Sequence, residues 1–212
     1  MTKLFGTNGI RGVVNKDMNV DLALNIGKAW GTYLKKNLKR PKVAIGTDAR
    51  LSNHMLKNAI SSGLTCTGCD VTDVGLVPTP TLQYTVKEKD FDSGVIITAS
   101  HNPPHFNGIK GVASDGTEFS KDVEEEIEKI YFNKEFNLSD WKDVGKIYYW
   151  DKAIELYTEG ILKNVDVDLI KKQNYHVVLD CGNGAGSVVT PNLLKKLGCK
   201  LTELYCKPDG TF

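Results

Sequence analysis

The chain has 212 residues, 41% of them hydrophobic, and its 27 lysine and arginine residues nearly balance 26 aspartate and glutamate residues. This length holds one large domain or two of about 100 residues each, and the composition is that of a globular rather than a disordered protein. The balanced charge argues against a nucleic acid or an anionic membrane as a partner, because neither would find a broad basic field on this chain.

Helical and extended patterns alternate along the first 130 residues. Asp21 precedes a helical pattern with basic residues in its last turn, and Ser52 is placed to cap a second helix. Thr79-Pro80 predicts a third helix with threonine as N-cap and proline at the first helical position, and Ser120 opens a fourth. Apolar runs predict strands at 43–46, 71–74, 94–98 and near 109–112.

Residues 133–149 are poorly periodic and place a candidate domain boundary at about residue 150. A second alternation follows, in which Asp151 caps a helix and residues 177–180 form a strand. A glycine-rich turn then opens a helix that Gly198 ends in the C′ position. Helices that alternate with short strands predict an α/β layered fold over both segments, 1–150 and 151–212.

The two segments share one plan. Residues 43–71 and 177–201 both run strand, loop and helix, followed by a Gly-Cys pair. This similarity is expected if the two segments are related α/β domains, and it is also expected from the general likeness of strand–helix–strand units. Both interpretations stay open.

Thr98 to Lys110, TASHNPPHFNGIK, is the most informative stretch because it places a serine, two histidines, two asparagines and a lysine on one predicted loop. The loop follows a buried strand, which is where open α/β sheets tend to place their chemistry. A hydroxyl is a weak nucleophile, so Ser100 would need partners that take its proton or hold charge. His101 is adjacent, Lys110 could fold back over the loop, and His105 is a weaker candidate.

Two further segments suggest a phosphate site. In Gly9-Ile-Arg-Gly12 the glycines let the backbone pass close to a phosphate, whose oxygens suit the planar fork of Arg11. Arg50 could steady the site from a neighbouring loop. The alternative for Arg11, His101 and Lys110 alike is an ordinary solvated surface side chain.

Two short motifs favour structural interpretations. Gly182-Asn-Gly-Ala-Gly186 does not have the spacing of a dinucleotide-binding loop and is interpreted as a tight turn, with phosphate capture at a helix N-terminus as the alternative. Cys66-Thr-Gly-Cys69 is a CxxC pair without a second ligand pair, and we interpret it as structural rather than metal-binding or redox-active. The cysteines number five, which argues against a secreted disulfide framework. With no apolar signal region or membrane span, cytoplasm is the expected compartment.

TASHNPP followed by NGIK resembles the active-site loop of the α-D-phosphohexomutases, which move phosphate between the 1- and 6-hydroxyls of a hexose. FGTNGIRG at 5–12 resembles the amino-terminal signature of the phosphoglucosamine mutase and archaeal phosphomannomutase branches. IGTDARLS at 45–52 and DVGLVPTP at 73–80 resemble further family segments in the expected order. Asn8 is a departure, because many relatives carry aspartate there. The resemblance covers essentially the whole chain.

The resemblance implies repeated α/β domains built as layered mixed sheets with flanking helices. The chain would hold domain 1, with the phosphoserine loop, in residues 1–150 and most of domain 2 in residues 151–212. It also implies an isomerase of carbohydrate metabolism, an intramolecular phosphotransferase that interconverts hexose 1- and 6-phosphates of glucosamine, mannose or glucose.

The implied route passes through a phosphoserine at Ser100 and a bisphosphorylated sugar. Arg11 would face the phosphoserine, Lys110 would act as a general acid or base near the transferred phosphate, and His101 would orient the loop or help to move a proton. The implied cofactor is Mg²⁺, with a phosphoserine oxygen at Ser100 as one ligand.

The family's Asp-rich DGDxDR-type loop has no match in residues 1–212. Its sugar-selecting segment and carboxy-terminal phosphate clamp are also missing, so we expect the piece by itself to be inactive. One alternative is a non-catalytic module that binds sugar phosphates, and another is a redox or metal protein that uses Cys66 and Cys69. The identity of the hexose phosphate and the oligomeric state are left open.

Overall fold

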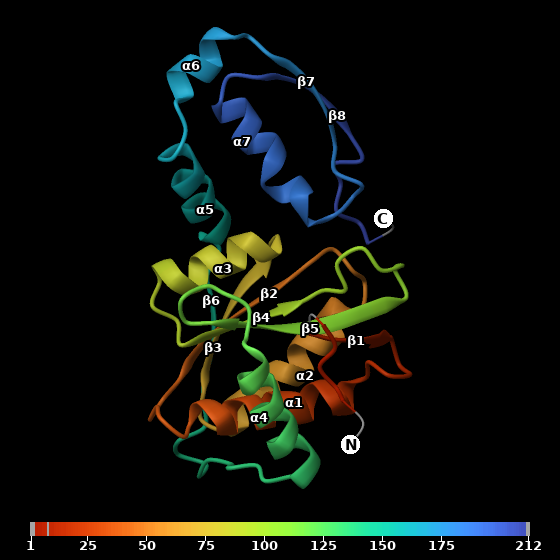
Figure 1. The fold of residues 1–212 in the computed structure, drawn as a ribbon, viewed down its shortest axis with the longest axis vertical. Helices are drawn as coiled ribbons and strands as arrows, with labels where there is room; N and C mark the ends of the chain where they lie inside the picture. The colour runs from red at the N-terminus through yellow and green to blue at the C-terminus, as the bar shows by residue number, and fades with distance from the viewer. Residues whose placement is uncertain (1–2, 8, 211–212) are drawn as a thin grey trace.

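The computed structural model describes residues 3–7 and 9–210, and Figure 1 shows their course. Asn8 lies outside the described residues. The elements confirm an α/β layered fold and are, in chain order, β1 (Ile10–Val13), α1 (Val20–Leu34), β2 (Lys42–Thr47), α2 (Asn53–Cys66), β3 (Asp70–Leu76), α3 (Thr79–Glu88), β4 (Ser93–Ile97), β5 (Phe106–Ala113), α4 (Lys121–Asn133), β6 (Ile147–Tyr149), α5 (Ala153–Leu162), α6 (Val167–Lys172), β7 (His176–Asp180), the 3₁₀ helix η1 (Ala185–Val188), α7 (Thr190–Lys196) and β8 (Lys200–Leu204).

The larger sheet is mixed, with strand order β1-β5-β4-β2-β3-β6. β4, β2, β3 and β6 run parallel to one another, whereas β5 is antiparallel to both β4 and β1. The carboxyl ends of the parallel strands therefore meet at one edge, and the loop that carries Ser100 leaves β4 there.

Helices cover both faces of this sheet. Figure 1 shows α1, α2 and α4 on one side and α3 on the other. Side chains along a strand alternate between the two faces, so Val43 and Ile45 pack with α1, α2 and α4 while Ala44 packs with α3. Strands buried on both faces explain the continuous apolar runs of the sequence.

α1 and α2 cross with their backbones very close together. A Cβ atom added at Gly27 would lie 2.4 Å from the Ile60 carbonyl oxygen, and one added at Gly63 would lie 2.2 Å from the Leu24 carbonyl oxygen. Both distances are far shorter than van der Waals contact, so this crossing requires glycine on each helix.

We expect Gly63→Ala to lower the free energy of unfolding by about 3 kcal/mol, because the added methyl group forces the two helices apart. Urea denaturation measures the change. The matched control is Ser62→Ala, at an exposed position of the same helix, which should cost less than about 0.5 kcal/mol. Equal unfolding midpoints for the two variants would show that the helices can separate without cost.

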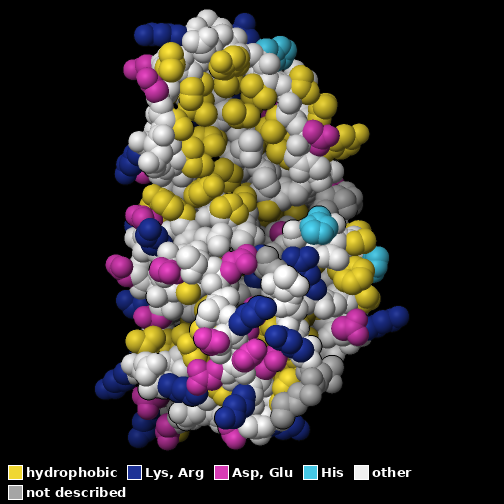
Figure 2. Space-filling model, viewed as in Figure 1, with side chains coloured by type: hydrophobic (Ala, Val, Ile, Leu, Met, Phe, Trp, Pro, Cys, Tyr) yellow, Lys and Arg dark blue, Asp and Glu magenta, His cyan; other side chains and the backbone are white. Residues whose placement is uncertain are grey.

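The second part of the chain is smaller and more open. β7 and β8 form a two-stranded parallel sheet whose exposed apolar side chains include Val178 and Leu204. Figure 2 shows hydrophobic side chains gathered over this upper region, above a lower region with more charge. Within the described residues, none of the helices combines the length and apolar content that crossing a bilayer requires.

Helix beginnings differ slightly from expectation. α1 begins after Asn19, whose side chain accepts a hydrogen bond from the Leu22 backbone N–H at 2.9 Å, and it ends before the basic residues that were expected in its last turn. Pro78, not Thr79, is the N-cap of α3, and Lys152, not Asp151, is the N-cap of α5. Each shift is within the usual uncertainty of a helix boundary.

Three short elements were not predicted. β1 lies in a glycine-flanked segment that looks like a turn, and it becomes a strand because it pairs with distant β5. β6 lies in the weakly periodic stretch before residue 150, and α6 has only six residues. Short elements that depend on non-local pairing leave little periodic signal in a sequence.

Candidate functional site

Ser100 lies on the short loop that follows β4, at the carboxyl edge of the parallel strands. Its neighbour Ala99 is buried, whereas Ser100 itself is exposed. Ser100 has φ of 55°, in the left-handed region that a non-glycine residue rarely adopts. Such backbone strain persists where surrounding contacts impose it, and it concentrates at functional sites. The loop therefore presents the hydroxyl to solvent from a backbone held in an unusual conformation.

Arg50 supports the backbone of this loop from below. Its side chain comes from the turn after β2 and is almost completely buried, with the residue 2% exposed. The guanidinium donates to backbone carbonyl oxygens along and just after the loop, and these hydrogen bonds are Nη2 to Ser100 at 3.0 Å, Nη2 to Asn102 at 2.7 Å, Nη1 to Pro103 at 2.7 Å and Nη1 to Phe106 at 2.8 Å. One planar fork thus ties together both ends of the loop.

Asp48 links Arg50 to the start of the loop. Its carboxylate accepts hydrogen bonds from Arg50 Nε at 3.1 Å, from Thr98 Oγ1 at 2.6 Å and from Asn53 Nδ2 at 2.9 Å. Thr98 Oγ1 in turn accepts from the Ser100 backbone N–H at 2.9 Å. A chain of polar contacts therefore runs from α2 through Asp48 to the backbone of Ser100, and every link is charge-assisted or partly buried.

A cavity of about 310 Å³ opens beside this loop. It is lined by residues that follow three parallel strands of the large sheet and by two residues of the glycine-rich turn after β7; among them are Asp48, Thr79, Thr98, Ser100, His101, Gly184 and Ala185. From the sequence, this glycine-rich turn is interpreted as structural. In the fold, it lines the same cavity as Ser100. Sequence reasoning missed its place in the site because the two loops are more than eighty residues apart.

The predicted partners of Ser100 are brought close to different degrees. Ser100 Oγ lies 3.4 Å from His101 Nδ1, which is long for a hydrogen bond between a hydroxyl and a ring nitrogen. Arg11, on β1, donates from Nη1 to Asn102 Oδ1 at 2.9 Å and so reaches the loop at its middle. Its Nε is buried and has no hydrogen-bond partner among the described residues.

Lys110 lies inside β5, which confirms the strand predicted near 109–112, but the strand begins earlier, at Phe106, so the loop is shorter than predicted. Within the sheet, Lys110 pairs with Ile96 of β4. The side chain is mostly buried, and Nζ donates to Glu118 Oε1 at 2.8 Å. An ordered strand thus holds this amine in place, together with a carboxylate partner. His105 remains on the loop, where its ring packs against Phe106.

The CxxC pair has the features of structural cysteines. Cys69 is fully buried, and burial raises the pKa of its thiol to about 11. Its sulfur lies 3.5 Å from Thr67 Oγ1, whereas the Cys66 thiol donates to the Gly63 carbonyl oxygen. The two thiols thus have different neighbours, in agreement with the structural interpretation.

The described residues do not complete a magnesium site. Within residues 3–7 and 9–210, no three His, Cys, Asp or Glu side chains are grouped so that they could hold a metal ion. Near Ser100, the Asp48 carboxylate is already used by Thr98, Arg50 and Asn53. Asp115 accepts from Thr117 within a turn, and Glu118 pairs with Lys110. A phosphate on Ser100 could contribute oxygens, but the remaining ligands would have to come from elsewhere.

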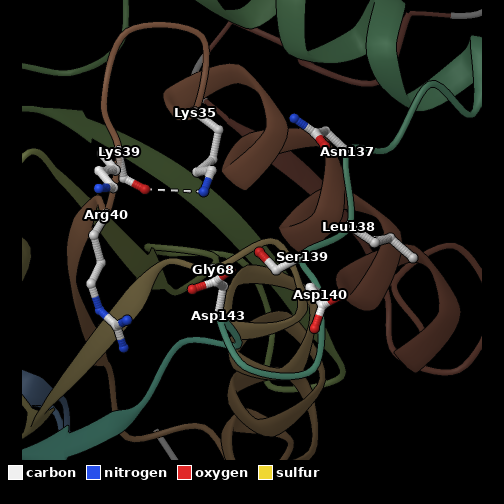
Figure 3. A pocket seen from close by; sticks show the side chains of 9 residues that line it. All are labelled: Lys35, Lys39, Arg40, Gly68, Asn137, Leu138, Ser139, Asp140 and Asp143. Atoms are coloured by element: carbon white, nitrogen blue, oxygen red, sulfur yellow. Dashed lines mark hydrogen bonds between the residues drawn. The ribbon is translucent and has the colours of Figure 1, made fainter.

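A second cavity, of about 370 Å³, lies at the opposite, amino-terminal edge of the parallel strands (Figure 3). Two of its basic side chains are already engaged within the chain. Lys35 Nζ donates to the Lys39 carbonyl oxygen at 3.0 Å, and Arg40 makes two hydrogen bonds to Asp70, which hold the pKa of that carboxyl below its usual value. None of the predicted catalytic residues lines this cavity.

Comparison with known families gives two matches in sequence order. Residues 2–138 match the model of phosphoglucomutase/phosphomannomutase α/β/α domain I, and residues 155–212 match that of α/β/α domain II. The large sheet with Ser100 falls in the first match, and the glycine-rich turn falls in the second.

Individual relatives agree with these models. The chain is 46% identical to a phosphoglucomutase/phosphomannomutase of Thermococcus kodakarensis and 44% identical to a phosphoglucosamine/phosphogalactosamine mutase of Sulfurisphaera tokodaii; both alignments cover all of this chain and 46% of the relative. A crystal structure of a phosphoglucomutase/phosphomannomutase family protein from Burkholderia thailandensis superposes with a TM-score of 0.86 at 30% identity, over 98% of this chain and 45% of that one. The chain thus spans about half the length of the curated relatives that it matches.

Proposed function

Because the chain belongs to the phosphoglucomutase/phosphomannomutase family, we propose that it forms the phosphoserine half of a mutase that interconverts hexose 1-phosphates and hexose 6-phosphates. The observation that carries this proposal is the exposed hydroxyl of Ser100, held on a strained loop beside a cavity that loops from both family-matched segments line. The proposed boundary between the two domains, at about residue 150, directly follows β6, the last strand of the large sheet.

The proposed reaction uses Ser100 as a carrier of one phosphoryl group. The bond from phosphorus to Ser100 Oγ breaks as a bond to the 6-hydroxyl oxygen of a hexose 1-phosphate forms, and the proton of that hydroxyl ends on Ser100 Oγ. The resulting bisphosphate turns over, and its 1-phosphoryl group passes to Ser100 Oγ while the serine proton ends on the 1-oxygen of the released hexose 6-phosphate. Phosphoryl transfer of this kind depends mainly on positioning and on charge stabilisation.

Three side chains are assigned to this work. Phosphoserine carries nearly two negative charges and three acceptor oxygens, and the buried Nε of Arg11 is a free donor close to the loop. We assign proton movement at Ser100 Oγ to His101, the side chain in reach of it. Lys110, with its ammonium hydrogen-bonded to Glu118, suits the role of a general acid better than that of a base.

The implied cofactor is Mg²⁺, which supplies charge neutralisation at phosphate oxygens when it is bound. We propose that a phosphoserine oxygen at Ser100 is one ligand and that the other ligands lie beyond the described residues. For the same reason we propose that the 212-residue chain alone does not turn over substrate.

The substrate is proposed to be an amino-sugar phosphate or mannose phosphate rather than glucose phosphate. This choice rests on the amino-terminal segment FGTNGIRG and on the similarity to a phosphoglucosamine/phosphogalactosamine mutase.

An assay of the complete protein tests the proposal. It should be offered the 1-phosphates of glucosamine, mannose and glucose with magnesium, and the 6-phosphates should be quantified by mass spectrometry. We expect conversion of at least one, with glucosamine or mannose phosphate faster than glucose phosphate. If none is converted while calorimetry shows that the 212-residue chain binds hexose phosphates saturably, the protein is a binding module and the mutase proposal is wrong.

A further inference from the structure

Two cysteines lie together where the small sheet ends. Cys181 follows β7, and its backbone N–H donates to the Leu204 carbonyl oxygen at 3.2 Å, which continues the parallel pairing of β7 and β8. Cys206 is two residues beyond the end of β8. In a regular strand, Cys206 would point to the face opposite Cys181, because side chains alternate.

Tyr205 removes this alternation. Its φ of 47° lies in the left-handed region, so the chain turns at this residue and Cys206 folds back over the ends of the two strands. The Cys206 sulfur lies 3.3 Å from the Leu204 carbonyl oxygen and 3.8 Å from that of Leu179 on the neighbouring strand. The Cys206 thiol neighbours the Cys181 thiol and is one of the groups that raise its pKa, and both residues are half-buried.

Burial, followed by the neighbouring Cys206 thiol, raises the pKa of the Cys181 thiol to about 11. Cys181 is therefore protonated at neutral pH, as Cys69 is, and what distinguishes Cys181 is the second thiol beside it. The contrast with Cys66 and Cys69 is informative, because that pair has the sequence motif but its two thiols face different partners.

Each thiol of the pair begins a segment that borders the Ser100 cavity. Cys181 precedes the turn from which Gly184 and Ala185 line the cavity. Cys206 begins the segment that ends at Gly210, where an added Cβ atom would lie 3.0 Å from the carbonyl oxygen of Ala49, another lining residue. A disulfide between the two thiols would join these two segments at their first residues.

We propose that Cys181 and Cys206 form a redox-active dithiol that hydrogen peroxide converts to a disulfide, and that this bond fixes the two segments beside the cavity. One peroxide oxidises the Cys206 thiol to a sulfenic acid and releases water. The Cys181 sulfur then attacks the sulfenic sulfur, the S–S bond forms, and a second water leaves with the thiol proton. In total, two thiols lose two protons and two electrons, and one peroxide becomes two waters.

Peptide mapping tests the link directly. The chain is treated with stoichiometric peroxide, the remaining thiols are alkylated, and the protein is digested with trypsin without reduction. Cleavage after Lys172, Lys195 and Lys200 places Cys181, Cys199 and Cys206 on three separate peptides. We expect peptide 173–195 joined to the peptide that begins at residue 201, about 2 Da lighter than their sum and released by dithiothreitol.

Two variants and a second readout complete the test. Cys199→Ser should keep the cross-link, and Cys206→Ser should abolish it and leave Cys181 open to alkylation after denaturation. Hydrogen exchange of residues 181–188 should slow at least about tenfold on oxidation of the wild type, and not in Cys206→Ser. If the wild type forms a cross-link through Cys199, Cys66 or Cys69 instead, or forms none, the proposal that Cys181 and Cys206 make a disulfide is wrong. If the hydrogen-exchange rate of residues 181–188 is the same in the cross-linked and the reduced protein, the disulfide does not fix these segments and that part of the proposal is wrong.

Discussion

Replacing Ser100 by alanine in the complete enzyme should reduce mutase turnover by about four orders of magnitude or more, because the oxygen that carries the phosphoryl group is gone and the remaining contacts cannot replace it. Ser100 is exposed, and its side chain makes only a long contact to His101. The free energy of unfolding should therefore change by less than about 0.5 kcal/mol. Turnover of hexose 1-phosphate and urea denaturation measure the two quantities.

Ser114→Ala is the matched control, since Ser114 is an exposed serine in the turn after β5, away from the lining of the Ser100 cavity. This variant should keep both normal turnover and normal stability. If Ser100→Ala keeps normal turnover, the assignment of Ser100 as the residue that carries the phosphoryl group is wrong. An equal loss in both variants would show that the effect has no specific connection with Ser100.

Arg50→Met should lower the free energy of unfolding by about 3–5 kcal/mol and turnover of the complete enzyme by about a hundredfold or more. The methionine would leave the carboxylate of Asp48 without its cationic partner and four backbone carbonyl oxygens without the guanidinium that donates to them. The loop would then relax from the strained conformation at Ser100. Arg50→Lys should recover only part of both losses, because an ammonium cannot reach the four carbonyls from one plane.

Arg40→Lys provides the comparison at an exposed position. Arg40 also pairs with an aspartate, but its side chain is 44% exposed, so its replacement should cost less than about 1 kcal/mol. Urea denaturation of the three variants gives the ranking. A stability of Arg50→Met close to that of Arg40→Lys would contradict the role of Arg50 as the support of the loop.

The position of Ser100 could be predicted because its signals are local. A buried apolar run, a sharp break at Pro103-Pro104 and the place of the loop at the end of a parallel strand are all visible in one short stretch. The large helices follow from their own periodicity in the same way. These features depend on residues that are near one another in the sequence.

The supports of the loop depend on residues that are far apart. The sequence placed Arg50 on a loop next to the site, but the four carbonyl oxygens that it reaches are fifty or more residues away along the chain. Lys110 was expected at the end of the loop, with a short strand predicted near residues 109–112. It lies on a strand because β5 finds partners on both sides, in β1 and β4.

The thiols give a similar lesson in the second part of the chain. Spacing singled out Cys66 and Cys69, whose sulfur atoms have different hydrogen-bond partners, whereas the proximity of Cys181 and Cys206 requires strand pairing and one left-handed residue. Neither condition has a signal in the spacing of cysteines. Contacts made by a single backbone reversal are visible only in the folded chain.

The most direct measurement is the location of phosphate after incubation of the complete enzyme with a hexose 1,6-bisphosphate. Tryptic peptide 90–110 contains Ser93, Thr98 and Ser100, and fragment ions distinguish the three. Ser93 is fully buried and the Thr98 hydroxyl is hydrogen-bonded to Asp48, so we predict a single phosphate, on Ser100. We also predict that this phosphate is lost from the enzyme when excess hexose monophosphate is added. Phosphate on another residue, or an unmodified Ser100 in an enzyme that turns over, would contradict the account.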